Sequence, residues 1–269
     1  MKVLLCPPTY FDVLYQINPH MKVGDVDKEL AYKQWGDLKS SLEEIGVECL
    51  EIEPVEALPD MVFTANQSLP FLKEGKLSVL LSKMANDERK PEVEFFKKWY
   101  KEKGYEIYEL PEEIESLEGM GDTLFHEERR FIWSAYGYRT TIEAHRYMQN
   151  VTGLEVKSLK LVDPAFYHLD VCLCPLGRGT ALVYKPAFDA ESYDKIESEF
   201  KNLILLTEDE AYNFAANAYS PDGKHVFLHP GSERVESRLR DSGFMPVSID
   251  TSEFMKSGGS VFCMKMELP

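Results

Sequence analysis

The apolar residues of this chain follow one pattern that recurs five times along its length. Each repeat begins with a short apolar run, continues with a polar segment whose apolar residues recur at helical spacing, and returns to a second apolar run. Four of the five polar segments end at a glycine, a common helix terminator. The pattern predicts a strand, a helix and a second strand in every repeat. The first strands are expected at 2–6, 77–83, 130–137, 180–185 and 225–231, the helices at 29–46, 93–104, 142–153, 191–202 and 234–243, and the second strands at 47–53, 105–111, 154–161, 203–207 and 244–250.

Each repeat then ends in a further short stretch, the closing segment, which carries unusual polar residues. The closing segments span 61–69, 119–125, 167–173, 213–220 and 257–263. Their alignment places Asn66, Asp122, Asp170, Asn217 and Ser260 at one equivalent position. Polar groups inside a protein are costly unless they bond to each other or to a ligand. Five aligned polar positions therefore predict a polar cavity where the repeats meet.

The repeats are best explained as five β-α-β-β modules of about 50 residues arranged in a ring. A single module cannot bury both its sheet and its helix, so neighbouring modules must pack together. A two-domain layout is the alternative, but no stretch rich in Gly, Ser and Pro divides the chain. We therefore expect one α/β domain over residues 1–269.

Composition adds a cellular context. Of 269 residues, 44% are apolar, enough for a substantial core. The five cysteines are an odd number at spacings that fit neither a disulfide scaffold nor a zinc site, which predicts reduced thiols in the cytoplasm. The N-terminal apolar run is too short for a signal peptide, and no run approaches the length of a membrane span. We expect a soluble protein without a membrane partner.

The formal charge of -16 argues against nucleic acid as a partner, because binding to a phosphate backbone depends on clustered Lys and Arg. The negative field weakly favours a small cationic substrate. The six histidines show no metal-ligand spacing, so we predict no metal site.

Three closing segments, or the residues next to them, carry groups with complementary chemistry: Glu118 and Asp122, His168 and Asp170, and Cys263. A thiol is a nucleophile only as thiolate, so Cys263 would need a neighbouring cation or polar site, and a histidine could move its protons. The alternative is a buried, inert cysteine and a structural histidine. Gly258 and Gly259 favour a catalytic role for Cys263, because they allow a ligand or another segment to approach closely.

The segments DMVFTAN (60–66), EGMGD (118–122), FYHLD (166–170) and GGSVFCMKMEL (258–268) resemble the guanidino-group-modifying superfamily of arginine deiminases, dimethylarginine hydrolases and amidinotransferases. The resemblance extends over nearly the whole chain and is strongest to the arginine dihydrolases. It implies a five-bladed α/β propeller, or pentein, built from five pseudo-symmetric ββαβ modules. It also implies a guanidino compound, arginine or a methylated arginine, as substrate and no cofactor.

By this resemblance Cys263 would attack the guanidinium carbon to form a covalent thiouronium adduct. His168 would be the general acid and base, while Asp170 and Glu118 would hold the guanidinium and Asp122 would lie beside them. Paired carboxylates suit this role because they attract a planar cation. Asn66 stands where arginine deiminases carry aspartate. An amide supplies both a donor and an acceptor. The resemblance to the dihydrolases implies that such a site retains the ureido product for a second attack and yields ornithine, ammonia and carbon dioxide.

The same resemblance implies a pair of arginines around the substrate α-carboxylate. Arg139 is retained, but Lys83 stands in place of the other arginine and loses its planar fork. Asn18 and Asp60 match positions at the cavity rim. Arginine deiminase, dimethylarginine dimethylaminohydrolase, amidino transfer to an amine and a non-catalytic propeller that binds a cationic amino acid stay open as alternatives. A homo-oligomer is also compatible with the sequence.

Overall fold

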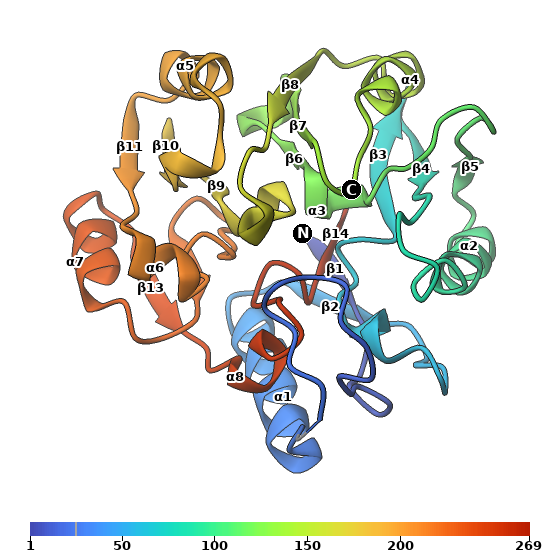
Figure 1. The fold of residues 1–269 in the computed structure, drawn as a ribbon, viewed down its shortest axis with the longest axis horizontal. Coiled ribbons are helices and arrows are strands. Elements are labelled where there is room, and N and C mark those ends of the chain that lie inside the picture. Colours follow the sequence, from blue (N-terminus) through green and yellow to red (C-terminus); the bar gives the residue numbers. More distant parts are fainter. Residues whose placement is uncertain (25) are drawn as a thin grey trace.

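The computed structural model describes residues 1–24 and 26–269, with every side chain in these ranges except that of Glu128. Within this part the strands form five small sheets, which Figure 1 shows arranged around the centre of the molecule. The sheets, in their strand order, are β14 (Met266–Leu268), β1 (Lys2–Leu5) and β2 (Glu48–Glu51); β3 (Ser68–Lys73), β4 (Lys76–Leu81) and β5 (Glu106–Tyr108); β6 (Thr123–Phe125), β7 (Ile132–Tyr136) and β8 (Val156–Lys160); β9 (Leu173–Gly177), β10 (Thr180–Val183) and β11 (Asn202–Leu205); and β12 (His225–Leu228) with β13 (Met245–Ser248).

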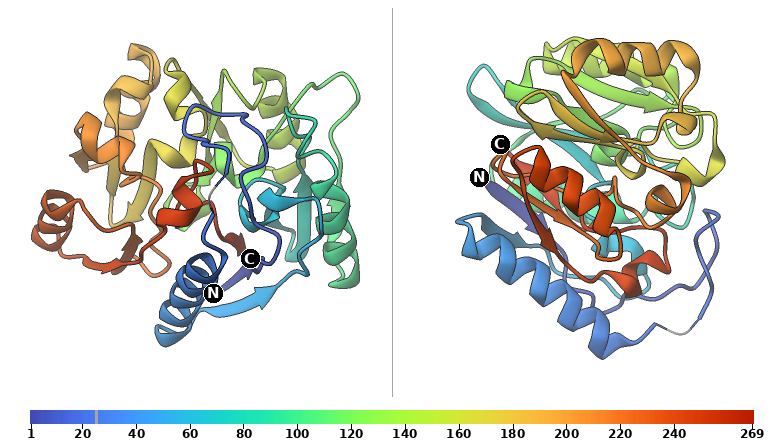
Figure 2. Two further views of the ribbon diagram at one scale, coloured as in Figure 1. Left: turned by 60° about the horizontal axis from the view of Figure 1, so that its bottom comes forward. Right: turned by 90° about the vertical axis from the view of Figure 1, so that its left-hand side faces the viewer.

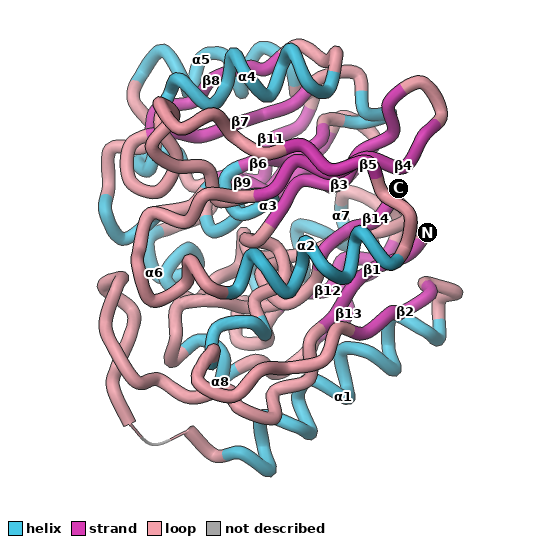
Figure 3. Tube along the Cα trace, turned by 90° about the vertical axis from the view of Figure 1, so that its right-hand side faces the viewer, coloured by secondary structure: helices cyan, strands magenta, loops and turns pink. Residues whose placement is uncertain are grey.

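The predicted strand-helix-strand units are confirmed. In each repeat the first and second strands pair in parallel and a helix joins them, as parallel pairing requires a long crossover. These helices lie on the outside of the molecule, as α1 and α2 do in Figure 3. They are α1 (Lys28–Glu44), α2 (Glu92–Glu102), α4 (Ile142–Thr152), α5 (Ala190–Glu199) and α7 (Glu233–Asp241).

The first helix illustrates why these segments fold as they do. The carboxylate of Asp27 caps α1 by accepting a hydrogen bond from the Leu30 amide. Ala31, Trp35, Leu38 and Leu42 then recur every three or four residues and form its buried face. Burial of this stripe against the sheet fixes the helix on the outside of the molecule.

The closing segments differ from the prediction in one respect, because three of the first four end in a strand that joins the sheet of the following repeat. For example, β3 pairs antiparallel with β4, and β14 at the C-terminus pairs with β1 at the N-terminus. The tight turn between β3 and β4 explains this pairing: Glu74 and Gly75 both have positive φ, which suits a two-residue hairpin. Three sheets are thus ordered β-β-α-β along the chain, and the first sheet takes its third strand, β14, from the C-terminus. The 213–220 segment contributes only an isolated bridge, Tyr219 to Phe227, to the two-stranded sheet of β12 and β13.

Hydrogen bonds link every closing segment to the next, and the fifth to the first. The five aligned polar side chains are all buried at these junctions. The linking bonds are Met120 N to Ala65 O, Leu169 N to Asp122 Oδ1, Asn217 Nδ2 to Asp170 O, Phe262 N to Asn217 O, and Ala65 N to Cys263 O. The predicted meeting of the repeats at a polar centre is confirmed.

The remaining short helices include α3 (Gly119–Asp122), α6 (Glu208–Tyr212) and α8 (Ser252–Met255). The two chain ends lie side by side, and the loop that follows β1 lies at the opposite end of the molecule (Figure 2). Among the described residues we find no helix with the length and apolar character needed to traverse a bilayer.

Candidate active site

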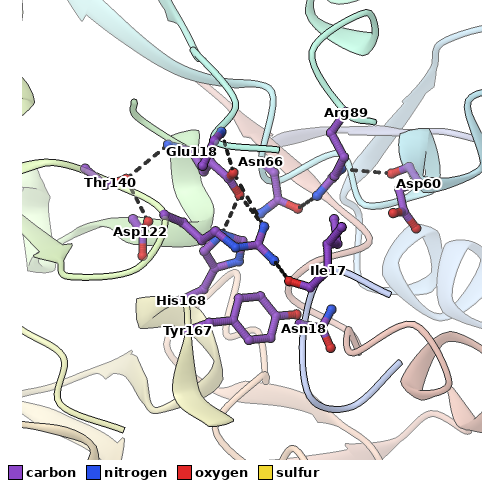
Figure 4. Close-up of polar contacts among 12 residues, drawn as sticks. Ile17, Asn18, Asp60, Asn66, Arg89, Glu118, Asp122, Thr140, Tyr167 and His168 are labelled. Carbon is purple, nitrogen blue, oxygen red and sulfur yellow. Dashed lines mark hydrogen bonds and ion pairs between the residues drawn. The ribbon is translucent and has the colours of Figure 1, made fainter. Parts of the chain in front are cut away.

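A small cavity forms where the closing segments meet the loop after β1. Six of the ten residues expected at the site line it. The lining includes Asn18, Asp60, Asn66, Arg139, His168 and Cys263 from the prediction, together with Ile17, Phe63, Arg89, Tyr167 and Gly259, among others. Figure 4 shows several of these side chains converging from different repeats.

Cys263 is held between an acid and an amide. Its thiol donates a hydrogen bond to Asp170 Oδ2 over 3.1 Å, and Asn217 Nδ2 donates to the sulfur over 3.2 Å. The side-chain oxygen of Asn217 also accepts the Cys263 amide at 3.3 Å, so this one residue positions both the backbone and the thiol. Asn217 was not predicted as a site residue, although its alignment with Asn66 and Asp170 was the available signal.

The electrostatics of this pair keep the thiol protonated. Burial raises the pKa of Cys263 well above its ordinary value, and the nearby Asp170 carboxylate raises it further. Burial also raises the pKa of Asp170 to about 7, although Cys263, Lys265 and Asn217 partly oppose this. Asp170 Oδ1 is buried and has no hydrogen-bond partner among the described residues. The free site therefore holds a thiol against a carboxylate that has one unused oxygen.

His168 is oriented by Glu118. The distance from His168 Nε2 to Glu118 Oε2 is 2.7 Å, and the same oxygen accepts Arg139 Nη1 at 3.1 Å. The Ala85 amide donates to Glu118 Oε1 over 3.0 Å. Burial alone would raise the pKa of Glu118, but Arg139 and His168 outweigh it and lower the pKa to about 2. Glu118 is fixed as an anion behind the histidine and does not line the cavity, unlike its expected place at the guanidinium.

Asn66 presents its amide to the cavity in a defined orientation. Its Oδ1 accepts a hydrogen bond from Arg89 Nη1 over 2.8 Å, which leaves Nδ2 buried and without a partner among the described residues. An unpaired buried donor costs free energy in the empty site. Asn66 is therefore ready to donate to an acceptor on a bound molecule.

Arg89 is a lining residue that the sequence did not reveal. Its guanidinium pairs with buried Glu92 at 2.9 Å and also donates to the Asp60 carbonyl. In sequence the pair stands at spacing i and i+3 at the start of a polar helix, which is typical of a surface ion pair. Nothing in the sequence near Arg89 distinguishes it from a residue of a surface ion pair.

Lys83, by contrast, does not reach the site. Its ammonium donates to the carbonyl oxygens of Glu112 and Ile114 at 2.9 and 2.6 Å, and the residue does not line the cavity. The backbone explains this: Lys83 forms an antiparallel bridge with Leu117, which directs its side chain toward the 112–114 turn. The expectation that Lys83 replaces a carboxylate-binding arginine is thus corrected, and Arg89 supplies the second cavity guanidinium beside Arg139.

The loop after β1 covers the cavity. Arg139 Nη2 donates to the Ile17 carbonyl over 2.7 Å while its guanidinium lies 4.8 Å above the Tyr167 ring. Asn18 Nδ2 donates to the Ser257 carbonyl over 3.1 Å, and Asp60 accepts from Tyr15 and Ser257. The rim positions Asn18 and Asp60 therefore hold the cover in place in the empty site.

The glycine pair before Cys263 permits this close packing. A Cβ on Gly258, whose φ is +87°, would lie 2.7 Å from Asn18 Oδ1, and a Cβ on Gly259 would lie 2.5 Å from the Phe63 ring. Both distances are too short for real contacts. The expectation that these glycines let another segment approach is confirmed.

Asp122 lies behind the residues that line the cavity. Its two oxygens accept the Leu169 amide at 3.2 Å and the Thr140 hydroxyl at 2.7 Å, and it does not line the cavity. Burial raises its pKa to about 7, against the opposing effect of His168. Among the described side chains, which leave out those of residues 25 and 128, we find no cluster of three His, Cys, Asp or Glu residues able to hold a metal ion.

The chain is similar to known proteins over nearly its whole length. The bifunctional arginine dihydrolase/ornithine cyclodeaminase ArgZ of Synechocystis sp. is 38% identical over 273 residues, which cover all of this chain and 38% of that protein. The N(G),N(G)-dimethylarginine dimethylaminohydrolase of Mycobacterium tuberculosis is 37% identical over 98% of this chain and 84% of its own length. The chain thus spans well under half of the bifunctional relative.

Solved structures extend the likeness to three dimensions. The N-terminal domain of ArgZ, in a cysteine-to-serine mutant bound to substrate, matches with a TM-score of 0.93 and 38% identity over 98% of this chain and 97% of that one. A dimethylarginine dimethylaminohydrolase adduct matches with a TM-score of 0.79 at 20% identity, which shows a shared fold.

A family model described as N,N dimethylarginine dimethylhydrolase, eukaryotic, matches residues 14–269. This match covers the cavity, its cover and the cysteine loop together. Together with the 37% identical mycobacterial relative, it shows that the chain belongs to the N,N-dimethylarginine dimethylhydrolase family.

Proposed function

We propose that this protein is an arginine dihydrolase, which converts L-arginine to ornithine, carbon dioxide and two ammonia molecules. The observation that carries the proposal is the Cys263 thiol, which is held against Asp170 and lines the same cavity as His168. The 38% identity to ArgZ, named an arginine dihydrolase, favours arginine as the substrate within the family. The two waters consumed per arginine balance the overall reaction.

The charges around the cavity suit the two ends of arginine. Asp170, with Oδ1 unpartnered, provides an anion beside Cys263 for the guanidinium. Arg89 and Arg139 place two guanidinium groups along the wall, and they would repel the substrate's cationic end but pair with its α-carboxylate. Arginine would therefore lie with its guanidinium carbon at the sulfur and its carboxylate toward the arginines.

Substrate binding activates the nucleophile in this mechanism. A guanidinium beside Asp170 brings positive charge close to the sulfur, which lowers the pKa of Cys263 and favours the thiolate. The thiol proton passes to His168, the thiolate attacks the guanidinium carbon, and His168 delivers the proton to the departing ammonia to leave a covalent thiouronium. His168 then takes a proton from water, which attacks the same carbon and releases citrulline and the thiol. Glu118 keeps the imidazole oriented throughout.

A second round acts on the bound citrulline. The sulfur attacks the ureido carbon, ammonia leaves, and an S-carbamoyl enzyme forms with the ornithine nitrogen still attached. Water then releases a carbamate, which decomposes to ornithine and carbon dioxide. Asn66 supports this round because its free Nδ2 can donate to the ureido oxygen, where negative charge develops during attack.

Hydrolysis of dimethylarginine is the second candidate, and the family match over residues 14–269 favours it. Both reactions use the same thiol chemistry and differ in the leaving group. The test is to incubate purified protein separately with L-arginine and with asymmetric dimethylarginine and to identify every product. Ornithine with two equivalents of ammonia is expected from arginine. Accumulating citrulline would contradict the dihydrolase assignment, and turnover of dimethylarginine alone would replace it with the second candidate.

We also infer that the five sheets form the blades of one closed propeller over residues 1–269. The β14–β1 pairing and the bonds that connect all five closing segments support this arrangement. The free state of all five cysteines in the described chain supports the prediction of a cytoplasmic location. The oligomeric state stays a prediction for solution measurement.

A further inference from the structure

A second cavity of about 710 Å³ lies behind the nucleophile, at the end of the ring where the chain termini meet. It shares no lining residue with the active-site cavity. Figure 2 shows the termini at one end of the molecule and the loop that covers the active site at the other. The walls of this second cavity come from the segment after β6, the β9–β10 hairpin and the loop after Asn217. The volume is that of a small-molecule site.

Two residues that line this space carry N–H groups for which we find no acceptor among the described residues. Arg129 pairs with Glu267 through Nη2, but its Nη1 is buried and has no partner among the described residues. His126 also lines the cavity, and its Nδ1 accepts the Trp133 indole N–H over 3.1 Å. That bond fixes the neutral tautomer, so Nε2 carries the hydrogen and is a donor. The two residues offer N–H groups that the chain itself leaves unused.

A buried cation lies behind one wall. The side chain of Lys265 is fully buried, and its ammonium sits 3.3 Å from the ring centre of Phe262 and 4.3 Å from that of Tyr219. Both aromatic residues line the cavity, and Lys265 Nζ has no hydrogen-bond acceptor in the described chain. A buried ammonium without an acceptor makes the electrostatic potential positive at the wall of the cavity that Phe262 and Tyr219 form.

The acids of the cavity leave these two N–H groups free. Glu267 pairs with Arg129 through Nη2 and not through Nη1, and Glu127 accepts the Gly179 amide. The remaining wall is largely apolar, with Met120, Leu124, Phe125 and Leu176. A ligand that complements this lining has one negative group for the N–H donors and an apolar body for the rest.

We propose that this cavity is a binding site for a small organic carboxylate with an apolar body. Its carboxylate accepts from Arg129 Nη1 and His126 Nε2, and its apolar part packs on Leu124 and Phe262. The site is distinct from the arginine site, and a bound ligand would contact Phe262, the residue directly before Cys263.

The test uses phenylacetate as the probe and phenylacetamide as its neutral match, titrated by calorimetry into the full-length protein. We expect saturable binding of one phenylacetate per chain, with the amide at least about tenfold weaker because it lacks the charge. Arg129→Met should weaken phenylacetate at least about tenfold. Arg130→Met is the matched control, since Arg130 does not line the cavity, and it should bind like the native protein.

His126→Phe is the second variant, because it preserves the stacking on Phe131 at 4.3 Å and removes the donor. It keeps the test decisive if Arg129→Met fails to fold, as judged by its circular dichroism and melting temperature. Absence of saturable phenylacetate binding, equal binding of the amide, or native-like binding by the folded variants would each overturn the proposal. None of these readouts depends on arginine turnover.

Discussion

The thiol of Cys263 donates its hydrogen bond to Asp170 Oδ2 over 3.1 Å, in a site where both side chains are buried. In the proposed mechanism Asp170 therefore has two partners in turn: the thiol before arginine binds and the guanidinium afterwards. The raised pKa of Cys263 means that its sulfur is protonated and unreactive in the free enzyme. Reactivity then depends on substrate binding.

The first prediction concerns pH. Burial raises the pKa of Asp170 to about 7, so the carboxyl is neutral below that pH and loses its attraction for the guanidinium. Because kcat/KM reports the free enzyme, it should fall about tenfold for each pH unit below about 7. Ammonia release from subsaturating arginine measures this limb. A flat profile between about pH 5.5 and 7 would contradict the role of Asp170.

Lys265→Met provides the control for that profile. Lys265 is one of the groups that lower the pKa of Asp170 against burial. Its removal should move the acid limb to higher pH, whereas a purely structural defect would lower kcat/KM without moving the limb.

The second prediction is that Lys265→Met stabilises the fold. Burial lowers the pKa of Lys265 from 10.5 to about 8, a difference that corresponds to about 3 kcal/mol. The sign is a cost: the unfolded chain binds the proton more tightly, so the penalty is fully present below about pH 8 and disappears as pH rises through 10.5. Urea unfolding at neutral pH should show an increased free energy of unfolding, with a gain that shrinks in alkaline solution. Destabilisation at neutral pH would show that the ammonium has an acceptor.

The third prediction concerns Asn66→Asp. A carboxylate keeps the contact with Arg89 but removes the free Nδ2 donor and adds negative charge where the ureido oxygen becomes anionic. The loss of one such donor typically costs a factor of about 100 to 1000. Citrulline should accumulate from arginine, with ornithine formation reduced by that order. Chromatographic product ratios measure the effect, and an unchanged ratio would remove Asn66 from the second round.

The fourth prediction separates the cavity arginines from Lys83. Lys83→Met should leave the KM for arginine unchanged, because its ammonium bonds to carbonyl oxygens outside the cavity. Agmatine, which lacks the α-carboxylate, should react with a kcat/KM at least about 100-fold lower than arginine, because it cannot pair with Arg89 and Arg139. A Lys83→Met variant with a raised KM, or agmatine turned over as well as arginine, would contradict this assignment.

Much of the fold was readable because it rests on local periodicity. The helix-strand alternation and the register of Asn66, Asp122 and Asp170 recur in the sequence itself, and burial of these polar positions follows from their alignment. The exchange of strands between repeats was not predicted, because pairing is a non-local property. The turns at Glu74–Gly75 and at Gly177–Gly179 were local signals of this exchange.

The site was predicted less completely for a physical reason. Residue types point to chemistry, but not to the direction of a side chain. Lys83 is diverted by its backbone bridge to Leu117, and Glu118 is turned toward His168 by Arg139 and the Ala85 amide. Arg89 has the sequence pattern of a surface ion pair, and only the folded chain brings it to the cavity.

The central claim is that Cys263 is the nucleophile that bonds to the guanidinium carbon, and an acid-quenched reaction analysed by mass spectrometry tests it directly. Protein mixed with arginine and quenched within the first turnovers should gain the mass of arginine less one ammonia, and peptide mapping should place the adduct on Cys263. The Cys263→Ser variant should bind arginine and show no such adduct. An adduct on another residue, or full turnover by the serine variant, would contradict the account.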